Sequence, residues 1–343
     1  MTATSPGARD ASLSTDSMTA WVQRTYGGPD TVRREQIDVP APSRGEVLLR
    51  LRATGVNNGD TRVMRGEPLL LRLAFGLRRP TQPVRGMDAA GTVIALGDGV
   101  TGFAPGDEVV CELPGGGGLA GYAVAPVKRL VRRPAALDPL VAAALPIAGG
   151  TAWQALERGG VAEGMRVLVI GASGGVGTFT VQLATLRGAD VWALCGERSR
   201  ELVERLGASR TFDYRTVQPG SPELGDAAFD VVIDIAGTSS LRSLQSLVRD
   251  GGAVVLVSGE GGRLIGPMGR ILAATLRSIG SRRPLRPLAA VAKPDVLAEL
   301  LALAADERLV PVIEHTWPLA EAGDALAHVD GLHAVGKTVV TIA

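Results

Sequence analysis

The chain has 343 residues, enough for two domains of ordinary size, and its 45% hydrophobic and 21% charged residues are typical of a globular enzyme. With 36 Lys and Arg against 35 Asp and Glu, the formal net charge is +1. Because phosphate contacts need a cationic surface, this balance argues against a dedicated nucleic-acid-binding protein, and we expect no nucleic-acid partner.

The chain begins with a polar segment, residues 1–17, which lacks the apolar run of a signal peptide and which we expect to be a disordered tail. No later apolar run is long enough to predict an integral membrane segment. Two lone cysteines, Cys111 and Cys195, cannot form a disulfide framework or a four-cysteine zinc site, so we expect both to be buried hydrophobic residues. We therefore expect a cytoplasmic protein in a reducing compartment.

Residues 18–140 are rich in short strands and turns. Glu46–Val56 alternates as a half-buried strand does, and Gly91–Leu96 and Asp107–Cys111 are further strands bounded by Gly-Asp and Pro-Gly turns. Many short strands with few long helices predict a compact, barrel-like β domain.

Residues 141–285 alternate between strands and helices. Met165–Ile170 is a near-continuous apolar run, as expected for a parallel strand covered on both faces. The strands expected after it are Asp190–Leu194, Phe229–Ile235 and Ala253–Ser258, and the expected helices are Glu201–Leu206 and Leu241–Arg249. This alternation predicts an α/β domain built on a doubly wound parallel sheet.

Residues 286–343 carry no nucleotide-binding motif. We expect a helix over Pro294–Glu307, a strand over Val310–Thr316, a helix over Ala320–His328 and a last strand over Lys337–Ile342. This segment is predicted to pack back onto the first domain, which makes that domain discontinuous.

The strongest chemical signal is GASGGVGT at residues 171–178, between a buried strand and a helix. Small residues allow a tight turn there, and the helix N-terminus offers N–H donors and a positive dipole end to a pyrophosphate. Ala172 replaces the first glycine of the G-x-G-x-x-G pattern, while Gly174 and Gly177 keep the other two. The residues expected to bind the cofactor are Ala172, Ser173, Gly174, Gly175, Val176, Gly177 and Thr178. The alternative is a glycine-rich turn without a ligand.

The end of the second strand bears on which dinucleotide is bound. An NAD site places a carboxylate there for the ribose, whereas this chain has Leu194. Arg198, with Ser199 beside it, is expected to hold the 2′-phosphate of NADPH. Two alternatives remain: the arginines cap a solvated helix, or Glu197 binds the ribose of NADH.

These residues belong to a wider resemblance that covers nearly all of the chain from Met18. The matching segments are GVNNGDTRVMRG (55–66), GMDAAGTVIALGDGVTGFAPGDEV (86–109), AAALPIAGGTAWQAL (142–156), VLVIGASGGVGTFTVQLA (167–184), LGASRTFDYR (206–215), FDVVIDIAG (229–237) and HAVGKTVVTI (333–342). The chain resembles the medium-chain dehydrogenase/reductase superfamily, and within it the zinc-free, zeta-crystallin-like quinone oxidoreductases. The resemblance implies a GroES-like catalytic domain, a Rossmann domain, a cleft between them and a homodimer through the edge of the Rossmann sheet.

The resemblance also implies further cofactor contacts. Tyr214 corresponds to a tyrosine that helps to bind the 2′-phosphate, and Lys337 to a basic position near the cofactor. The other residues expected beside the cofactor are Ala236, Gly237, Ser258 and Gly259.

The zinc ligands of the related alcohol dehydrogenases are absent from the corresponding positions. Asn57 stands in place of a zinc-binding cysteine, and Met87 and Asp88 in place of a His-Glu pair. Thioether and amide groups are poor zinc ligands, so we expect no metal. The three histidines show no ligand spacing and are expected to be surface or structural residues: His315, His328 and His333.

Without zinc, a conjugated acceptor such as a small apolar quinone or an α,β-unsaturated carbonyl suits hydride transfer better than an alcohol. Asn57 is the candidate donor to the developing oxyanion, and the alternative is that its amide orders the loop. We expect Asp60 to hold that loop or a neighbouring arginine, and Thr151 to contact the nicotinamide side. Water is the expected proton source, because no Tyr or His stands out as an acid.

The sequence leaves two functions open: an NADPH-dependent reductase, and a nucleotide-binding structural or regulatory protein without significant turnover. Two segments, Leu69–Arg79 and Leu264–Arg283, mix apolar residues with arginines. They are interpreted as a lid for an apolar substrate, as a peripheral membrane-facing surface, or as packed helices with their arginines in solvent.

Overall fold

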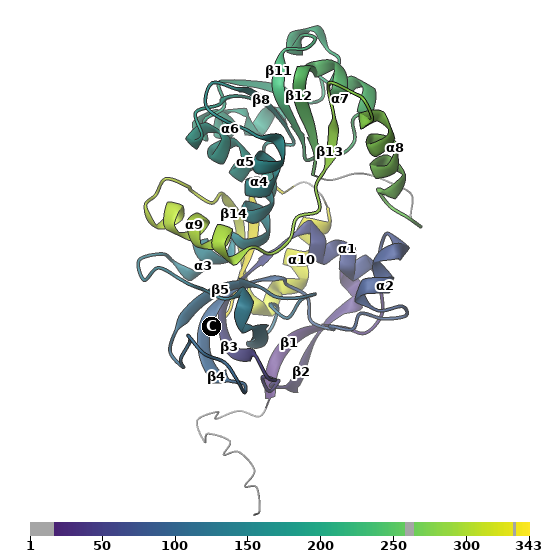
Figure 1. The fold of residues 1–343 in the computed structure, drawn as a ribbon. Helices are drawn as coiled ribbons and strands as arrows, with labels where there is room; N and C mark the ends of the chain where they lie inside the picture. The colour runs from purple at the N-terminus through teal and green to yellow at the C-terminus, as the bar shows by residue number, and fades with distance from the viewer. Residues whose placement is uncertain (1–16, 258–263, 332–333) are drawn as a thin grey trace, which may run out of the picture.

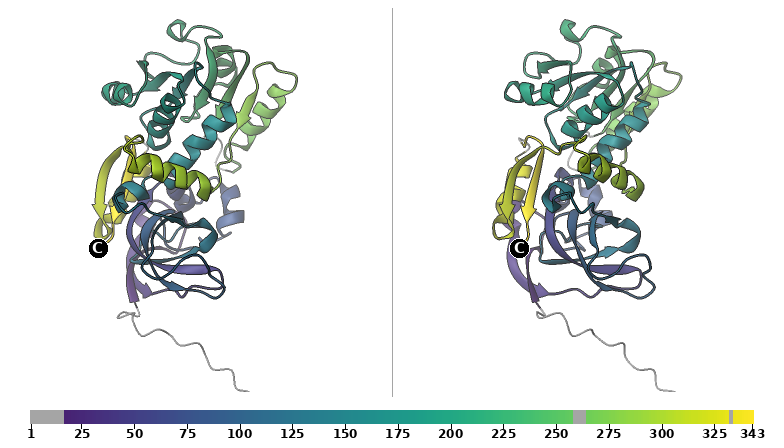
Figure 2. Two further views of the ribbon diagram at one scale, coloured as in Figure 1. Left: turned by 60° about the vertical axis from the view of Figure 1, so that its left-hand side comes forward. Right: turned by 90° about the vertical axis from the view of Figure 1, so that its left-hand side faces the viewer.

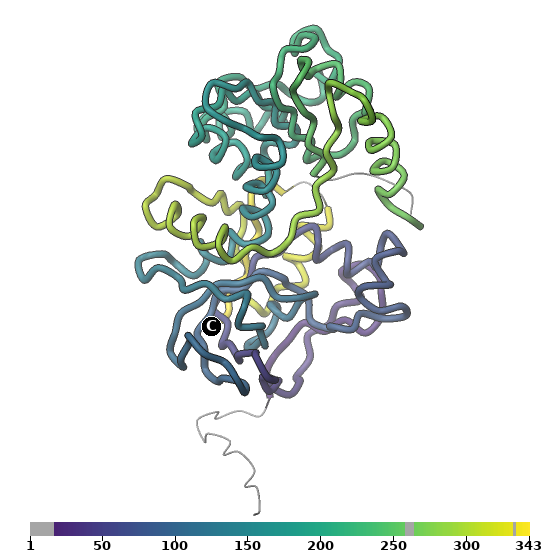
Figure 3. Tube along the Cα trace, in the orientation of Figure 1, coloured from purple at the N-terminus to yellow at the C-terminus, as the bar shows by residue number. Residues whose placement is uncertain are grey.

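The computed structural model describes residues 17–257, 264–331 and 334–343. The chain folds into two halves, each built on its own sheet (Figure 1). Figure 3 traces the chain from the purple-blue lower half up through one long helix into the teal-green upper half, and then back down. No helix among the described residues is long and apolar enough to cross a membrane.

The upper half contains a six-stranded sheet in which every neighbouring pair of strands is parallel. In spatial order, the strands are β10 (Arg210–Asp213), β9 (Asp190–Cys195), β8 (Arg166–Ile170), β11 (Phe229–Asp234), β12 (Val248–Leu256) and β13 (Leu285–Pro287). Numbered from β8, this is the order 3-2-1-4-5-6 of a Rossmann sheet. The order reverses between β8 and β11, which is where such sheets bind their ligands.

Alternating residues of the parallel strands enter two separate cores. Val167 and Val169 of β8 pack in the core with α4 and α5, while Leu168 and Ile170 pack in the core with α7 and α8. These helices are α4 (Pro146–Gly159), α5 (Gly175–Leu186), α7 (Leu241–Leu247) and α8 (Met268–Ser278), and α6 (Arg200–Arg205) follows β9. Coverage of both faces explains the unbroken apolar run of β8.

The lower half contains a seven-stranded, mostly antiparallel sheet. Its strands, in spatial order, are β14 (Ile313–Pro318), β15 (Lys337–Thr341), β3 (Glu46–Val56), β4 (Asp88–Leu96), β5 (Glu108–Glu112) and β7 (Val131–Arg132), and β6 (Tyr122–Pro126) also pairs with β3. The C-terminal strand β15 is antiparallel to β3, and Figure 2 shows these yellow strands beside the purple ones. The predicted fold class is confirmed: a parallel Rossmann sheet plus a GroES-like, mostly β half.

Shorter elements complete the lower half and the junction. They are the antiparallel pair β1 (Ser17–Gln23) and β2 (Val32–Asp38), the helices α1 (Asn58–Arg65), α2 (Arg72–Phe75), α3 (Pro139–Ala143), α9 (Pro294–Ala305) and α10 (Ala322–Asp330), and the 3-10 turns η1 (Pro29–Thr31), η2 (Leu69–Leu71), η3 (Val127–Arg129), η4 (Glu197–Ser199), η5 (Pro222–Leu224) and η6 (Leu319–Glu321). Helices α4 and α9 lie between the two sheets (Figure 1).

Several expected boundaries were wrong: Ser17 belongs to β1 and not to the tail, β12 begins at Val248 and not at Ala253, and β14 begins at Ile313 and not at Val310. Two further shifts bear on the packing and on the site. The helix expected over Leu241–Arg249 ends at Leu247, because Val248 is buried and pairs with Phe229 as the first residue of β12. The second strand of the Rossmann sheet continues through Cys195, one residue beyond its expected end, so the residue that follows it is Gly196.

Candidate active site

The loop after β8 is shaped for an anion by its backbone. Gly171 has a φ of +85°, and a Cβ on Gly177 would lie 2.1 Å from the Gly171 carbonyl oxygen, so this approach excludes a larger residue. Ala172 occupies the first glycine position. The residue is fully buried, and its N–H donates to the Leu194 carbonyl at 3.1 Å.

The start of α5 leaves backbone donors unused. Gly174 is the N-cap residue, and the N–H groups of Gly175, Val176 and Gly177 donate to no backbone carbonyl of a described residue. Such N–H groups at the positive end of a helix dipole bind phosphate groups. The residues present therefore fit the pyrophosphate of a dinucleotide.

The C-terminal segment lies directly against this loop. The Gly336 N–H donates to the Ser173 carbonyl at 2.8 Å, and Gly174 and Gly336 form a parallel bridge. The Lys337 side chain then passes α5, with its Cδ 3.3 Å from the position of a Cβ on Gly175. The structure thus brings the Lys337 side chain to the loop.

The end of β9 offers space and positive charge. A Cβ on Gly196 would lie 3.6 Å from Cε1 of Tyr214 and 3.8 Å from Nη1 of Arg215. Arg215 lies over the Tyr214 ring at 4.9 Å, and Arg198 is exposed nearby in η4, where Ser199 is buried. Sequence reasoning missed Arg215, although it directly follows Tyr214.

The Glu197 carboxylate, the alternative ligand for a ribose, forms an ion pair within the chain. Glu197 pairs with Arg200 at 3.2 Å, and Arg200 also donates to Thr211 at 3.0 Å. Arg200 is therefore committed to local contacts, whereas Arg198 has no ion pair with a described residue.

The loop after β11 reaches the phosphate loop from the other side. The N–H of Gly237 donates to Asp234 at 3.0 Å, and the Ala236 nitrogen is 3.2 Å from the position of a Cβ on Gly171. Asp234 is fully buried and also pairs with Arg270 of α8 at 2.9 Å. Burial raises the pKa of Asp234, and the Gly237 N–H and Arg270 oppose that shift. Ser258 and Gly259 lie outside the described residues.

A buried polar cluster lies where three distant segments meet. Asp88, at the start of β4, accepts the Asn57 side-chain amide at 2.8 Å and the Lys337 ammonium at 3.4 Å on one oxygen, and the Ile147 N–H at 3.1 Å on the other. The same ammonium donates to Oδ1 of Asn57 at 2.5 Å and to the Val56 carbonyl at 3.4 Å. Burial raises the pKa of Asp88, and the Lys337 charge opposes that shift.

The Asn57 amide is only partly committed to this cluster. One N–H of Nδ2 is directed to Asp88, and the nearest further acceptor is the Gly55 carbonyl at 3.5 Å. The side chain is nearly buried, and its residue precedes α1. The amide both orders the loop and retains a weakly used donor.

Asp60 holds the same loop through the backbone. Its carboxylate accepts the N–H groups of Asn57 and Gly86, both at 2.9 Å. Burial raises the pKa of Asp60 to about 6, against the effect of these hydrogen bonds and of Arg85. The prediction that Asp60 holds the loop is confirmed.

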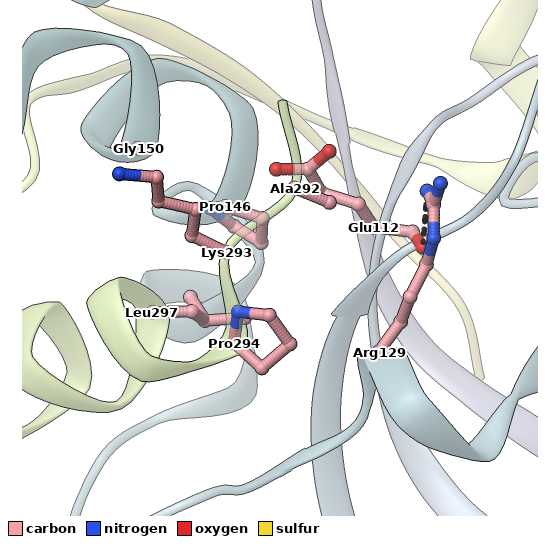
Figure 4. A pocket seen from close by; sticks show the side chains of 8 residues that line it. All are labelled: Glu112, Arg129, Pro146, Gly150, Ala292, Lys293, Pro294 and Leu297. Atoms are coloured by element: carbon pink, nitrogen blue, oxygen red, sulfur yellow. Dashed lines mark hydrogen bonds between the residues drawn. The ribbon is translucent and has the colours of Figure 1, made fainter. Parts of the chain in front are cut away.

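Helix α4 carries Thr151 past this cluster. The residue is half-buried and lies one turn after Ile147, whose N–H is bound by Asp88. Beside it is a small cavity, which the Glu112 carboxylate enters from the β5 side (Figure 4). The cavity is lined by Glu112, Arg129, Pro146, Gly150, Ala292, Lys293, Pro294 and Leu297.

Sequence reasoning missed Glu112. It stands opposite Asp88 in the β4–β5 register, and its backbone carbonyl accepts a hydrogen bond from Arg129 at 3.5 Å. Burial and the neighbouring Asp88 charge raise the pKa of Glu112 to about 7, against the effect of Arg129. The alternation of β5 could have placed this residue on the Asp88 face, but no motif marked it.

The described residues contain no group of three or more His, Cys, Asp or Glu side chains that could hold a metal ion. His328 pairs with Glu314 at 2.9 Å and meets the His315 ring edge to face, while His333 lies outside the described residues. Both cysteines are buried, and burial raises the pKa of Cys111 to about 12 and that of Cys195 to about 11, so each remains a thiol.

Comparisons with known proteins agree with this architecture. Residues 43–135 match the alcohol dehydrogenase GroES-like domain family, and residues 206–340 match the zinc-binding dehydrogenase family. The chain is 35% identical to the chloroplast envelope quinone oxidoreductase homolog of Arabidopsis thaliana, over 92% of this chain and 95% of that protein. It is 33% identical to the quinone oxidoreductase of Rattus norvegicus, over 91% of this chain and 93% of that one.

Solved structures give the same result. The quinone oxidoreductase from Coxiella burnetii superposes with a TM-score of 0.84 at 25% identity, over 95% of this chain and all of that one. The chain therefore belongs to the medium-chain dehydrogenase/reductase superfamily, as an oxidoreductase related to the quinone oxidoreductases.

Proposed function

We propose that the protein is an NADPH-dependent, zinc-independent oxidoreductase that transfers hydride to a quinone or an α,β-unsaturated carbonyl. The observation that carries the proposal is the junction of the glycine loop with the buried cluster. The Lys337 side chain contacts both regions: it passes the α5 N-terminus, where the N–H groups of Gly175–Gly177 donate to no described backbone carbonyl, and it donates to Asn57.

The loop residues Ala172–Thr178 bind the pyrophosphate of the cofactor, with the α5 N–H groups as donors and Lys337 as a nearby cation. Ala236 and Gly237 border the same site. The bound cofactor supplies the hydride. What the chain must add is position, a dry cleft and a donor to the acceptor oxygen.

Asn57 supplies that donor. Its second amide N–H, held near the Gly55 carbonyl at 3.5 Å, can turn to an oxygen that gains negative charge during hydride transfer. Asp88 and Lys337 position the amide, and Thr151 orients the nicotinamide side. Water supplies the proton that completes the reduced product.

Zinc independence is supported by the charge already present. The Lys337 ammonium donates to Asn57 and to Asp88, two side chains whose oxygen atoms could otherwise bind a cation. A divalent ion at these oxygens would meet a buried positive charge.

The preference for NADPH is supported by the absence of a side chain at Gly196 and by the cations around it. Arg198, Arg215 and the Tyr214 hydroxyl can meet a 2′-phosphate there, with Ser199 close by. Equal or better kinetics with NADH would remove this part of the proposal.

We also propose a homodimer through the outer edge of β13, which pairs with β12 alone among the described strands. Light scattering at micromolar concentration tests it.

The test of the function is stopped-flow mixing of the NADPH-loaded protein with a panel of quinones and enones, with the metal content of the same sample measured in parallel. Oxidation of NADPH above background in metal-free protein supports the proposal. No oxidation with any acceptor would favour a nucleotide-binding protein without turnover, and stoichiometric zinc would contradict zinc independence.

A further inference from the structure

Two segments expose an unusual amount of apolar side chain. The exposed fractions run from 41% for Leu70 to 76% for Ile279. The residues, called here the apolar patch, are Leu70, Leu73, Leu77, Leu264, Ile265, Met268, Leu272, Leu276 and Ile279. For α8, the interpretation as a packed helix with its arginines in solvent is wrong, because α8 buries only Ala274 while its leucines are exposed.

The two segments form one surface across the junction of the two halves. The Leu70 N–H donates to the Leu264 carbonyl at 3.1 Å, and a Cβ on Gly266 would lie 2.4 Å from Cγ of Pro68. Helices α2 and α8 lie on the same side of the molecule, one below and one above this contact (Figure 1).

Polar contacts beneath the patch hold both segments in place, so the exposed leucines lie on ordered structure. The Tyr26 hydroxyl donates to the Gly76 carbonyl at 2.5 Å, and Arg72 lies over the Tyr26 ring at 4.4 Å. On α8, Arg270 turns inward to the buried Asp234. The helix is anchored by its polar face, and its apolar stripe at residues 265, 268, 272, 276 and 279 faces outward.

The two segments that carry the patch contain arginines and no acidic residue. No Asp or Glu occurs in residues 68–87 or 264–294. Arg78, Arg79 and Arg277 are exposed, and none of them pairs with a carboxylate of a described residue. Two further arginines, Arg282 and Arg283, share Asp250.

We propose that the apolar patch docks the protein on the surface of an anionic lipid bilayer. Exposed leucines at helical spacing enter the boundary between headgroups and acyl chains, and the arginines attract anionic headgroups. A second copy seated patch to patch would bring the same arginines of both chains together. The proposed homodimer therefore uses the edge of β13 and not this patch. The inference does not depend on the proposed reductase activity.

The test is flotation of the purified full chain with vesicles of phosphatidylcholine alone or of phosphatidylcholine with phosphatidylglycerol. The protein is expected to float with the anionic vesicles and to be released by high salt. Leu272→Glu/Leu276→Glu should lower the partition coefficient at least roughly tenfold, and Arg78→Glu/Arg79→Glu should lower it by about the same factor.

Matched controls separate docking from general changes in charge and hydrophobicity. Leu186→Glu/Val310→Glu alters exposed apolar residues elsewhere, and Arg33→Glu/Arg34→Glu makes the same charge change on β2. Both controls should float like the wild type, and all variants should melt cooperatively.

Three outcomes would overturn the proposal. One is no flotation of the wild type at low salt, and another is equal loss in the patch variants and their controls. The third is a wild type that is dimeric and does not float with vesicles, together with a patch variant that is monomeric. The patch would then bind a second copy.

Discussion

The phosphate loop and the Asn57–Asp88–Lys337 cluster lie side by side, yet they are built in opposite ways. In the loop, the groups proposed to bind the cofactor are backbone N–H donors. The loop needs positions without a side chain, as at Gly177, where a Cβ would clash. In the cluster, the backbone is ordinary and three buried polar side chains satisfy one another. A local backbone site is written in one short run of sequence, whereas a cluster of side chains exists only after the fold has closed.

The largest expected effect concerns the cluster. Asp88→Asn leaves the buried Lys337 ammonium without its carboxylate, so the free energy of unfolding should fall by about 3–5 kcal/mol. Denaturation in urea measures this. Adding Lys337→Met should restore part of the loss, because the uncompensated charge is then gone. A change below about 1 kcal/mol in the single variant would show that the pair is not coupled.

The loop should respond through binding rather than stability. In Gly177→Ala, the new Cβ meets the Gly171 carbonyl at 2.1 Å, and the loop must shift. We expect NADPH affinity to fall roughly a hundredfold, which fluorescence titration measures. Gly269→Ala is the matched control, because a Cβ there meets nothing within 4 Å. Equal affinities for the two variants would remove the loop from the cofactor site.

Glu112 tests the electrostatics beside the cluster. Its pKa of about 7 lies above its ordinary value of 4.5, so its contribution to stability is complete below about pH 4.5 and is lost as the pH rises through 7. As the pH rises from 4.5 to 8, the free energy of unfolding of Glu112→Gln should therefore increase by about 2 kcal/mol relative to that of the wild type, after allowance for solvent screening.

The control for this prediction lies on the same strand. Burial would raise the pKa of Glu108, but hydrogen bonds from Thr92 and Arg133 outweigh it and lower that pKa. Glu108→Gln should therefore lose stability above its titration range. Unfolding curves from pH 4 to pH 8 give the change in stability of each variant relative to the wild type. A change of the same sign in both variants would refute the opposite pKa shifts of Glu112 and Glu108.

The smallest effect separates positioning from binding in the cluster. Asn57→Ala removes the proposed oxyanion donor and should lower kcat/KM roughly tenfold with little change in NADPH affinity. Asn58→Ala, an exposed neighbour in α1, should leave both unchanged. An unchanged rate in Asn57→Ala would leave its amide with only the ordering role.

The sequence predicted the loop and both sheets because each signal there is local. The apolar run of β8, the glycine spacing and the return of β15 to β3 all followed from pattern or resemblance. The resemblance marked Asn57, Asp88 and Lys337 singly, Asp88 only as the replacement of a zinc ligand, but it did not predict that the three side chains bind one another. These residues are up to 280 positions apart, and only pairing of β15 with β3 brings them together.

Other parts of the site carried no readable signal. The raised pKa of Glu112 depends on burial and on the charge across β4, which no sequence spacing reveals. The strand β9 ends at Cys195, one residue later than expected, so the residue after the strand is Gly196. The direction of the α8 leucines was also unreadable, because it depends on the Arg270 anchor.

A crystal structure of the protein with bound NADPH tests the central claim most directly. The account predicts pyrophosphate oxygens at hydrogen-bonding distance from the N–H groups of Gly175–Gly177, the Lys337 ammonium still bound to Asn57 and Asp88, and no metal at those two residues. A nucleotide bound elsewhere, or a glycine loop closed by side chains in its presence, would contradict it.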